Sequence, residues 1–443
     1  MGARRRSEVV DIKKLAMLVR ELEDGLAVCM RCGMCQSVCP LYAETGRESD
    51  VARGKLALLD GLIREIVKNP AGVNERLSRC LLCGSCAANC PSGVKVVDIF
   101  LKARAILGAY LGLSPVKKAL FRGVLANPGI FNRIVEWGAR GQDFFIKPAD
   151  RLVGTSCARF ASPLGERRFQ ALAPVAFHKA AGRVDTAAGE SGLKVAFFVG
   201  CLVDKIFPRV GEAVMEVLDR RGVGVFIPEE QACCGIPALS SGDSTAFATL
   251  VRHNAALLSS GSYDYIVSAC ATCTSTIKKV WPLMAPELAP ETLSAVRALA
   301  EKTLDVSQFL VDKTGAGPVE GGAGFDAPLS ITYHDPCHLK KSLGVSEQPR
   351  ILLRAAPGLV LKEMAEADRC CGCGGSFNLN YYEISRAIGE RKRTNIVGSG
   401  CGVVATSCPA CMLQLSDVLS RAGDRIRVRH VVEVYAEALR RGK

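Results

Sequence analysis

The sequence lacks any hydrophobic run long enough to cross a membrane. Its longest uninterrupted apolar stretch is VAFFVGCLV, whereas a membrane-spanning helix needs about 20 apolar residues. The basic start, MGARRRSEVV, is followed by charges at Asp11, Lys13 and Lys14 instead of the apolar core and cleavage site of a secretory signal. These absences predict a cytoplasmic protein, in which thiols stay reduced.

The sequence also lacks the common motifs for nucleotides and nucleophiles. No GxGxxG follows a strand-like run and opens a helix, and no P-loop ends in GK[ST]. The stretch CCGCGGSF contains GxGG, but its cysteines and its lack of a basic residue argue against a phosphate cradle. We see no flavin site and no serine or cysteine triad, so we assign no catalytic residue to this chain.

Aromatic residues are sparse, at 6%, and no basic patch is interleaved with them. The formal net charge of +13 is therefore weak support for nucleic-acid binding. Metal-bound cysteines are thiolates, and a cubane cluster with four of them carries a net charge of about −2, which would offset part of this excess. We expect no nucleic-acid partner, and we retain an acidic protein or an anionic lipid surface as a partner of the basic residues.

Cysteine is what the chain has in excess. It has 21 cysteines in 443 residues, an odd number that argues against a framework made only of disulfides. One stretch, DRCCGCGGSF, places Cys370, Cys371 and Cys373 among glycines. In a reducing compartment such crowding is better interpreted as metal binding.

Two N-terminal runs share the spacing C-x2-C-x2-C-x3-C-P, which holds [4Fe–4S] clusters in bacterial ferredoxins. The runs contain Cys29, Cys32, Cys35, Cys39 and Pro40, and Cys80, Cys83, Cys86, Cys90 and Pro91. In such runs the fourth cysteine serves the other cluster. The predicted ligand sets are Cys29, Cys32, Cys35 and Cys90 for one cluster, and Cys80, Cys83, Cys86 and Cys39 for the other. Structural zinc also uses CxxC pairs, but two complete copies with both prolines favour iron–sulfur.

The C-terminal half contains an internal repeat. One copy runs from LKVAFFVGCLVD through EEQACCGIPALSSGD to YDYIVSACATCTSTI, and the other from LSITYHDPCHLKK through EADRCCGCGGSF to GCGVVATSCPACMLQL. Each copy holds one cysteine, then Cys-Cys-Gly, then Cys-x-x-Cys. The intervals are 32 and 36 residues in the first copy and 33 and 37 in the second. Spacing duplicated this closely predicts two similar domains.

Strand-like and helix-like segments alternate within each copy. The strand-like runs are KVAFFVG, VGVFIP and YDYIVSA in the first copy and LSITYHD, LVLKEM and GVVATS in the second. Alternation of this kind predicts parallel strands joined by right-handed crossovers. Because ligands bind beyond the carboxyl ends of such strands, five cysteines from three loops are expected to converge on one centre.

The expected fold class is a multidomain α+β protein. An N-terminal helical ferredoxin-type domain with two [4Fe–4S] clusters is expected over residues 1–100, and a helical connector over 101–192. Two duplicated α/β cysteine-rich domains are expected over 193–315 and 326–443. The connector is interrupted by LSPVKK, ANPG and IKPAD, which are typical of helix ends and turns.

These residues resemble a known family. A cysteine followed by CCG and then CxxC is the pattern of the cysteine-rich CCG domain, which heterodisulfide reductase subunits share with the iron–sulfur subunits of glycolate oxidase, lactate-utilisation and anaerobic glycerol-3-phosphate dehydrogenase systems. A two-cluster ferredoxin domain followed by two CCG domains is most similar to the glycolate oxidase iron–sulfur subunit. The stretches CMRCGMCQSVCPLY, ARGKLALL and CLLCGSCAANCPSGV add to the likeness.

The resemblance implies that the five cysteines of each copy bind iron–sulfur. Matched position by position, the first set is Cys201, Cys233, Cys234, Cys270 and Cys273, and the second set is Cys337, Cys370, Cys371, Cys408 and Cys411. In the heterodisulfide reductase branch such a set holds a noncubane [4Fe–4S] centre. Relatives with incomplete motifs hold an ordinary cluster or zinc, so one or two further clusters are expected, of a type that the motif leaves open.

Some residues near the motifs have no assigned role. Three cysteines lie outside the pattern, namely Cys157, Cys373 and Cys401, and free cysteine is commonly a small buried hydrophobe. His334 and His338 flank Cys337, where an imidazole either donates to sulfur and tunes a cluster or only satisfies nearby backbone. Asp335 and Pro336 are expected to form a turn.

The first predicted helix has one apolar face, made by Ile12, Leu15, Val19 and Leu22, behind Arg4–Arg6. A basic amphipathic helix can lie on an anionic membrane, which would place the protein at the inner face of the cytoplasmic membrane. Packing of this face against the ferredoxin-type domain is the simpler interpretation, and we favour it.

The resemblance implies an electron-transfer subunit of a glycolate or lactate dehydrogenase. An FAD-containing partner subunit would oxidise the 2-hydroxy acid, and this chain would pass the electrons to a quinone or another carrier. Three alternatives stay open: a heterodisulfide-reductase-like subunit that cleaves a disulfide at the CCG centres, the iron–sulfur subunit of an anaerobic glycerol-3-phosphate dehydrogenase, and a C-terminal half that is a zinc-stabilised scaffold.

Overall fold

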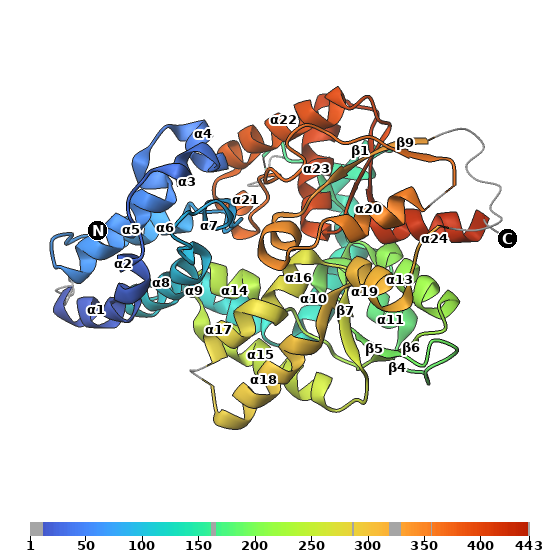
Figure 1. Ribbon diagram of the computed structural model, residues 1–443, viewed down its shortest axis with the longest axis horizontal. Coiled ribbons are helices and arrows are strands. Elements are labelled where there is room, and N and C mark those ends of the chain that lie inside the picture. Colours follow the sequence, from blue (N-terminus) through green and yellow to red (C-terminus); the bar gives the residue numbers. More distant parts are fainter. Residues whose placement is uncertain (1–11, 161–164, 286–287, 319–328, 356, 442–443) are drawn as a thin grey trace.

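The computed structural model describes residues 12–160, 165–285, 288–318, 329–355 and 357–441 (Figure 1). A helical N-terminal part, drawn in blue, lies to one side of two α/β parts. The first α/β part is drawn from green to yellow and the second from orange to red. The three parts contact one another.

The N-terminal part is built from helices that alternate with cysteine loops. The helices are α1 (Ile12–Val19), α2 (Glu23–Ala27), α3 (Met34–Ser37), α4 (Pro40–Thr45), α5 (Ala52–Ile63), α6 (Pro70–Ser78), α7 (Ser85–Ala88) and α8 (Val96–Leu111). Leu15, Val19 and Leu22 are buried in a core with Leu59 and Phe100. The expected packing of the first helix on the ferredoxin-type domain is confirmed for these three side chains.

Two parts of the predicted amphipathic segment lie outside the described residues. They are the side chain of Ile12 and the preceding arginines Arg4–Arg6. Within the described ranges, the helices are all too short or too polar to reach across a bilayer.

The connector differs from the expected all-helical segment. It contains α9 (Pro115–Lys118), α10 (Pro128–Phe145) and α11 (Phe177–Ala181), but also an antiparallel sheet of β1 (Ile146–Asp150), β2 (Thr155–Ala158) and β3 (Phe169–Gln170). The backbone amides of Leu152 and Val153 donate to Asp150 Oδ1, and Gly154 follows at φ 77°. This turn reverses the chain, so IKPAD, expected to be only a break, pairs with TSCA.

The first α/β part has the predicted parallel strands. They are β5 (Lys194–Phe197), β6 (Gly224–Ile227), β7 (Tyr265–Ser268) and β8 (Thr303–Asp305), with β4 (Val184–Asp185) antiparallel at one edge, in the order β4-β6-β5-β7-β8. The helices are α12 (Cys201–Lys205), α13 (Pro208–Arg220), α14 (Ile236–Ser240), α15 (Ser244–Ser259), α16 (Ala271–Ser275), α17 (Trp281–Met284), α18 (Pro290–Lys302) and α19 (Val306–Thr314).

The second α/β part repeats this order. Its parallel strands are β9 (Leu329–His334), β10 (Leu359–Leu361), β11 (Val403–Thr406) and β12 (Arg427–His430), in the order β10-β9-β11-β12. The helices are α20 (Glu347–Arg354), α21 (Ser376–Asn380), α22 (Tyr382–Gly398), α23 (Pro409–Ala422) and α24 (Val431–Arg441), and a π turn, η6 (His338–Ser342), follows β9. The predicted duplication and the multidomain α+β fold class are confirmed.

The two α/β parts share one core. Phe197 and Val267 of the first sheet are buried in the same apolar cluster as Tyr333 and Ala405 of the second, together with Tyr435 of α24. Helices α13 and α24 pack against each other across the boundary. Because this interface is apolar and buried, the two repeats are held in a fixed relation, and their cysteine loops face one another.

Candidate metal centres

The cysteines of the two N-terminal runs lie in loops that glycine turns sharply. Gly33 has φ 86° and Gly84 has φ 72°, and each directly precedes a short helix that carries the third cysteine of its run. A residue with a Cβ atom is strained at these angles, whereas glycine is not. Glycine therefore permits the sharp turn in each of the two loops.

The thiols of the second run gather with the last thiol of the first run. One cavity is lined by Cys39, Cys80, Cys83 and Cys86. Burial raises the pKa of Cys39 to about 12, and the neighbouring charges of Cys83 and Cys80 add to the rise. The structure therefore brings together the four thiols that the spacing predicts for one cluster.

The remaining four thiols are less enclosed. Cys29 lies close enough to Cys35 to add to the rise in the pKa of the Cys35 thiol, which burial dominates. Cys90 packs at the edge of the same apolar core as Cys29 and Cys35. Cys32 is exposed. This half of the ferredoxin-type domain lies nearer the molecular surface.

Two buried cations lie near these loops, and sequence reasoning missed both. Lys55 lines the cavity, is 1% exposed and donates to the backbone carbonyl of Asp50. Arg104 of α8 donates to the carbonyl oxygens of Cys80 at 2.7 Å and of Ser240 at 2.8 Å. Lys55 stands in ARGKLALL, the stretch that carried part of the resemblance, and a lysine at an inward helix position was the available signal.

The first set lies at the carboxyl ends of parallel strands, as expected. Cys201 follows β5, Cys233 and Cys234 follow β6, and Cys270 and Cys273 flank the start of α16 after β7. The Sγ atoms of Cys201 and Cys233 are 3.8 Å apart. Cys234 hydrogen-bonds with both Cys233 and Cys273. The five thiols thus form one group at the sheet edge.

Neutral side chains hold the backbone of the Cys-Cys loop of the first set. Asn254 of α15 accepts from the amide of Ala232 at 2.9 Å and donates to the carbonyl of Cys233 at 3.0 Å. Trp281 Nε1 donates to the carbonyl of Cys234 at 2.9 Å. These bonds fix the Cys-Cys-Gly backbone without adding charge beside the thiols.

The second set has the same placement in the second sheet. Cys337 follows β9, Cys370 and Cys371 follow β10, and Cys408 and Cys411 flank the start of α23 after β11. The Sγ atoms of Cys371 and Cys411 are 3.4 Å apart. Cys370 hydrogen-bonds with Cys337, and Cys411 with Cys408.

The two sets touch each other, which the sequence did not reveal. The thiols of Cys270 and Cys408, which occupy equivalent positions in the two copies, are hydrogen-bonded. Thr272 Oγ1 lies 3.5 Å from the Sγ of Cys408. At the other end, Cys83 of the ferredoxin-type domain hydrogen-bonds with Cys370. The thiols therefore form a continuous line from the ferredoxin-type domain through the second set to the first.

Hydrogen bonds along this line shift the pKa values of the thiols unequally. The pKa values of Cys234, Cys371 and Cys408 are lowered, because each accepts hydrogen bonds from two neighbouring thiols. The donors are Cys233 and Cys273 for Cys234, Cys370 and Cys411 for Cys371, and Cys270 and Cys411 for Cys408. Buried thiolates at this spacing repel one another, so metal cations are the partners that allow all of them to ionise.

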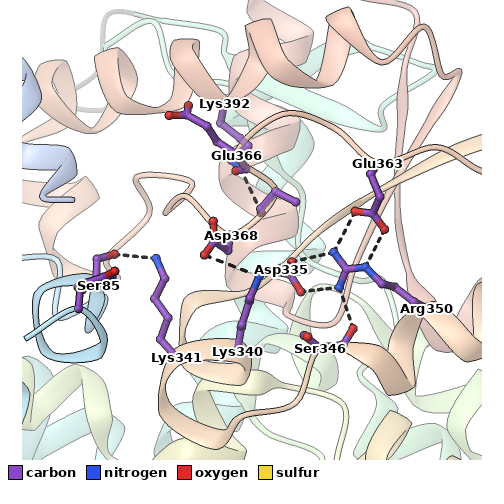
Figure 2. Close-up of polar contacts among 12 residues, drawn as sticks. Ser85, Asp335, Lys340, Lys341, Ser346, Arg350, Glu363, Glu366, Asp368 and Lys392 are labelled. Atoms are coloured by element: carbon purple, nitrogen blue, oxygen red, sulfur yellow. Dashed lines mark hydrogen bonds and ion pairs between the residues drawn. The ribbon is translucent and has the colours of Figure 1, made fainter. Parts of the chain in front are cut away.

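An ion-pair network borders the second set (Figure 2). The buried carboxylate of Asp335 accepts two hydrogen bonds of 2.8 Å from Arg350, which also donates to Glu363 at 2.7 and 3.0 Å. Lys340 lies 3.6 Å from Asp335. Asp335, expected only to form a turn, thus anchors the end of β9 to α20.

The short π-helix η6 contacts both other parts of the molecule. His338 Nε2 lies 3.2 Å from the carbonyl oxygen of Leu82, and its Nδ1 lies 3.1 Å from Thr272 Oγ1. Lys341 donates to Ser85 Oγ at 2.7 Å, as Figure 2 shows. Because the Thr272 hydroxyl also contacts the Sγ of Cys408, it connects His338 Nδ1 to that sulfur.

Two buried basic side chains lie beside the second set. His334 is 0% exposed, burial lowers its pKa to about 3, and one ring nitrogen lies within 4.8 Å of the sulfurs of Cys371 and Cys411. Lys392 of α22 is also 0% exposed and donates to the carbonyls of Glu366 at 2.5 Å and Ala367 at 3.2 Å. Burial lowers the pKa of Lys392 to about 8.

The three unassigned cysteines lie in different surroundings. Cys373 is close to the second set, since burial and then the charge of Cys371 raise its pKa. Cys401 precedes β11, whereas Cys408 follows it, so the two lie at opposite ends of that strand. Cys157 lies on β2 of the connector sheet. Of the three, Cys373 alone is placed by these observations beside a predicted centre.

The donor chemistry fits iron–sulfur groups. All 21 cysteines are free thiols, and most of those in the two sets are buried. Thiolate sulfur is the ligand of iron–sulfur clusters and also of structural zinc. His334 adds a buried imidazole whose two nitrogens have no hydrogen-bond partner in the part of the chain that the structure describes.

Two family models match the chain. The cysteine-rich domain model matches residues 195–278 and 331–416, and the 4Fe-4S dicluster domain model matches residues 25–94. These ranges contain the first set, the second set and the two N-terminal runs. The predicted combination of a dicluster ferredoxin-type domain with two CCG domains is confirmed, and the chain carries multiple iron–sulfur clusters.

Several known proteins are similar to the chain over most of their own length. The chain is 29% identical over 427 residues to the probable glycolate oxidase iron-sulfur subunit of Bacillus subtilis, with 94% of each protein covered. It is 31% identical over 242 residues to lactate utilization protein A 2 of Bacillus mycoides, which covers 55% of this chain and 98% of that protein. It is 28% identical over 441 residues to one of the subunits of the fumarate reductase (CoM/CoB) of Methanothermobacter marburgensis, covering 98% of this chain and 76% of that protein.

One solved structure shares the fold. A hypothetical protein from Helicobacter pylori superposes with a TM-score of 0.54 at 10% sequence identity, over 97% of this chain and 76% of that one. The likeness extends over the whole arrangement of parts and concerns the fold alone.

Proposed function

This chain belongs to the family of iron–sulfur proteins that includes lactate utilization protein A and the glycolate oxidase iron-sulfur subunit, and on that premise we propose that it is the electron-transfer subunit of a 2-hydroxy-acid dehydrogenase. The observation that supports this most is the continuous line of hydrogen-bonded thiols, which runs through Cys83, Cys370, Cys371, Cys411, Cys408 and Cys270. Iron–sulfur clusters accept single electrons, so a contiguous series of them suits conduction.

We propose the following ligands. One cubane is held by Cys29, Cys32, Cys35 and Cys90, and the other by Cys80, Cys83, Cys86 and Cys39. The CCG centres are held by the first set (Cys201, Cys233, Cys234, Cys270 and Cys273) and by the second set (Cys337, Cys370, Cys371, Cys408 and Cys411). The grouping of Cys39 with the second run and the convergence of each set at a sheet edge support these assignments.

The chain's own residues position and insulate these groups. Asn254 and Trp281 fix the Cys-Cys loop of the first set. Lys392 fixes the backbone just before the Cys-Cys pair of the second set. His338 and Lys341 hold the second α/β part against the ferredoxin-type domain, and His338 also bonds to Thr272 of the first α/β part. The buried thiols are kept from water by the surrounding apolar core, which limits the reorganisation of polar surroundings when charge moves.

The partners belong to the same proposal. An FAD-containing subunit would oxidise glycolate or lactate and deliver electrons one at a time, and a quinone or another carrier would receive them. The subunit role of the named relatives supports a multisubunit complex. We place the complex in the cytoplasm, or peripherally at the inner face of the cytoplasmic membrane.

The test is anaerobic purification of the tagged chain from its native host. We expect an FAD protein to co-purify and the visible absorption of the clusters to bleach on addition of glycolate or lactate. If dithionite bleaches the clusters while neither acid does, the substrate assignment is wrong. If no flavoprotein accompanies the chain, the proposed partner is wrong.

A second candidate function is reduction of a disulfide at the CCG centres. The contact between Cys270 and Cys408 places two complete five-cysteine sets side by side, and the Methanothermobacter relative is a reductase named for CoM and CoB. In this case, a disulfide substrate should change the EPR signals of the CCG centres in the absence of any 2-hydroxy acid. Unchanged signals would exclude this candidate.

A further inference from the structure

His334 lies beside the second set, and its imidazole has no hydrogen-bond partner among the residues that the structure describes. It is the last residue of β9 and is completely buried. Neither Nδ1 nor Nε2 has a hydrogen-bond partner among the residues described. A buried polar nitrogen without a partner destabilises the fold, so the presence of an imidazole here indicates a ligand that protein atoms do not supply.

The geometry identifies where that ligand would be. One ring nitrogen lies within 4.8 Å of the Sγ atoms of Cys371 and Cys411, and those two sulfurs are 3.4 Å apart. Thiolate sulfur and imidazole nitrogen bind a first-row metal at about 2.3 and 2.0 Å, so donors on one tetrahedral metal stand about 3.5 to 4 Å apart. The three donor atoms are therefore close to the spacing of one metal corner.

The charges around the ring favour its neutral form. The ammonium of Lys392 is near His334 and disfavours a second positive charge. Asp335, the carboxylate next in sequence, is already engaged by two hydrogen bonds from Arg350 (Figure 2). A neutral imidazole has one nitrogen with a free lone pair. Neutral imidazole, through such a lone pair, is the commonest metal ligand among side chains.

The first copy has no such nitrogen. The residue three positions before Cys201 is Phe198, and the residue three positions before Cys337 is His334. Phe198 is buried and packs edge-on against Trp281 with ring centroids 6.4 Å apart. If this position only needed an aromatic ring to fill space, phenylalanine would serve in both copies.

We propose that His334 binds iron of the second-set centre through a ring nitrogen, beside Cys371 and Cys411, and that the first-set centre has cysteine ligands only. The two CCG centres then differ in chemistry although their cysteine motifs are the same. Iron–sulfur centres with imidazole ligands have higher reduction potentials than centres with thiolate ligands alone, so the second-set centre would be the better electron acceptor. The inference rests on the second set holding an iron–sulfur centre and is independent of the substrate.

The experiment uses the full chain, purified anaerobically with natural-abundance histidine and with 15N-histidine, and reduced with dithionite in steps. Pulsed EPR at each potential should show one strongly coupled nitrogen whose frequency changes with the 15N label. No variant is needed for this result, so a folding defect cannot obscure it. Absence of any label-dependent nitrogen coupling at every potential would overturn the proposal.

Variants assign the nitrogen. His334→Phe, which copies the first repeat, and His334→Cys, which offers a thiolate instead, should both lose the coupling, and His334→Cys should keep the iron content of the wild type. His253→Gln is the matched control, since the His253 ring bonds the carbonyl of Glu230, and it should keep the coupling. A coupling that survives in His334→Cys, or about one zinc per chain in the wild type, would refute iron ligation by His334.

Discussion

At the scale of single residues, the two CCG copies differ in the charge of the side chain that holds the Cys-Cys loop. Counted back from the CxxC motif, Lys392 occupies the position of Asn254 in the first copy. Both side chains hold the backbone that precedes or forms the Cys-Cys pair, but only Lys392 brings a positive charge. A cation beside a cluster favours the reduced state, which carries one more negative charge.

Lys392→Asn should therefore lower the potential of the second-set centre and leave the others nearly unchanged. A unit charge at about 8 Å with an effective dielectric constant of about 20 is worth about 2 kcal/mol, or on the order of 50 to 100 mV. EPR-monitored potentiometric titration measures the shift. Lys68→Asn, at an exposed lysine, is the matched control, and an equal shift in both variants would contradict the argument.

One proposed ligand and one unassigned cysteine give a second test at this scale. Cys371→Ala should lower the iron content by about four per chain, because it removes one of five thiols from the second set. Cys157→Ala, on the connector sheet, should keep the wild-type iron content. Iron determination on anaerobically purified protein decides this, and equal iron in the two variants would remove Cys371 from the proposed ligands.

At the scale of elements, periodicity and turn residues predicted the strands well. The runs KVAFFVG, VGVFIP and YDYIVSA correspond to β5, β6 and β7, because buried parallel strands are short, apolar and rich in β-branched residues. The connector sheet was missed. IKPAD contains a proline and only one strongly apolar residue, and its pairing with TSCA depends on an Asp150 turn that propensity does not reveal.

The Asp335–Arg350 pair is the polar joint between β9 and α20. Arg350→Met should lower the free energy of unfolding by about 3 to 5 kcal/mol, because it leaves the buried Asp335 carboxylate without its bidentate partner. Chemical denaturation under anaerobic conditions measures the loss. Arg354→Met removes an exposed pair with Glu347 and should cost about 0 to 1 kcal/mol. Similar losses in both variants would mean that burial of the pair is not decisive.

At the scale of the whole molecule, the sequence predicted the parts but not their junctions. Spacing groups the thiols within each copy, whereas the contacts of Cys270 with Cys408 and of Cys83 with Cys370 depend on how three parts pack. Those packing surfaces are made by scattered residues such as Arg104, His338 and Lys341. His338 and Lys341 stand just after Cys337, but no spacing rule shows which segments of the other parts their side chains contact.

Removal of iron should destabilise the molecule as a whole. The clusters hold loops from all three parts, and metal-binding free energy adds to folding free energy. We expect the chelated, iron-free protein to unfold at a clearly lower temperature than the iron-loaded protein, followed by circular dichroism without oxygen. Melting curves that coincide would show that the thiol loops are held by the polypeptide alone.

The central claim is that iron–sulfur centres occupy both the ferredoxin-type domain and the two CCG domains in one continuous series. The most direct test is the iron and zinc content of the anaerobically purified chain. Four [4Fe–4S] centres predict about sixteen irons per chain and no stoichiometric zinc. About eight irons together with zinc would contradict the claim, because the C-terminal half would then be a zinc-stabilised scaffold.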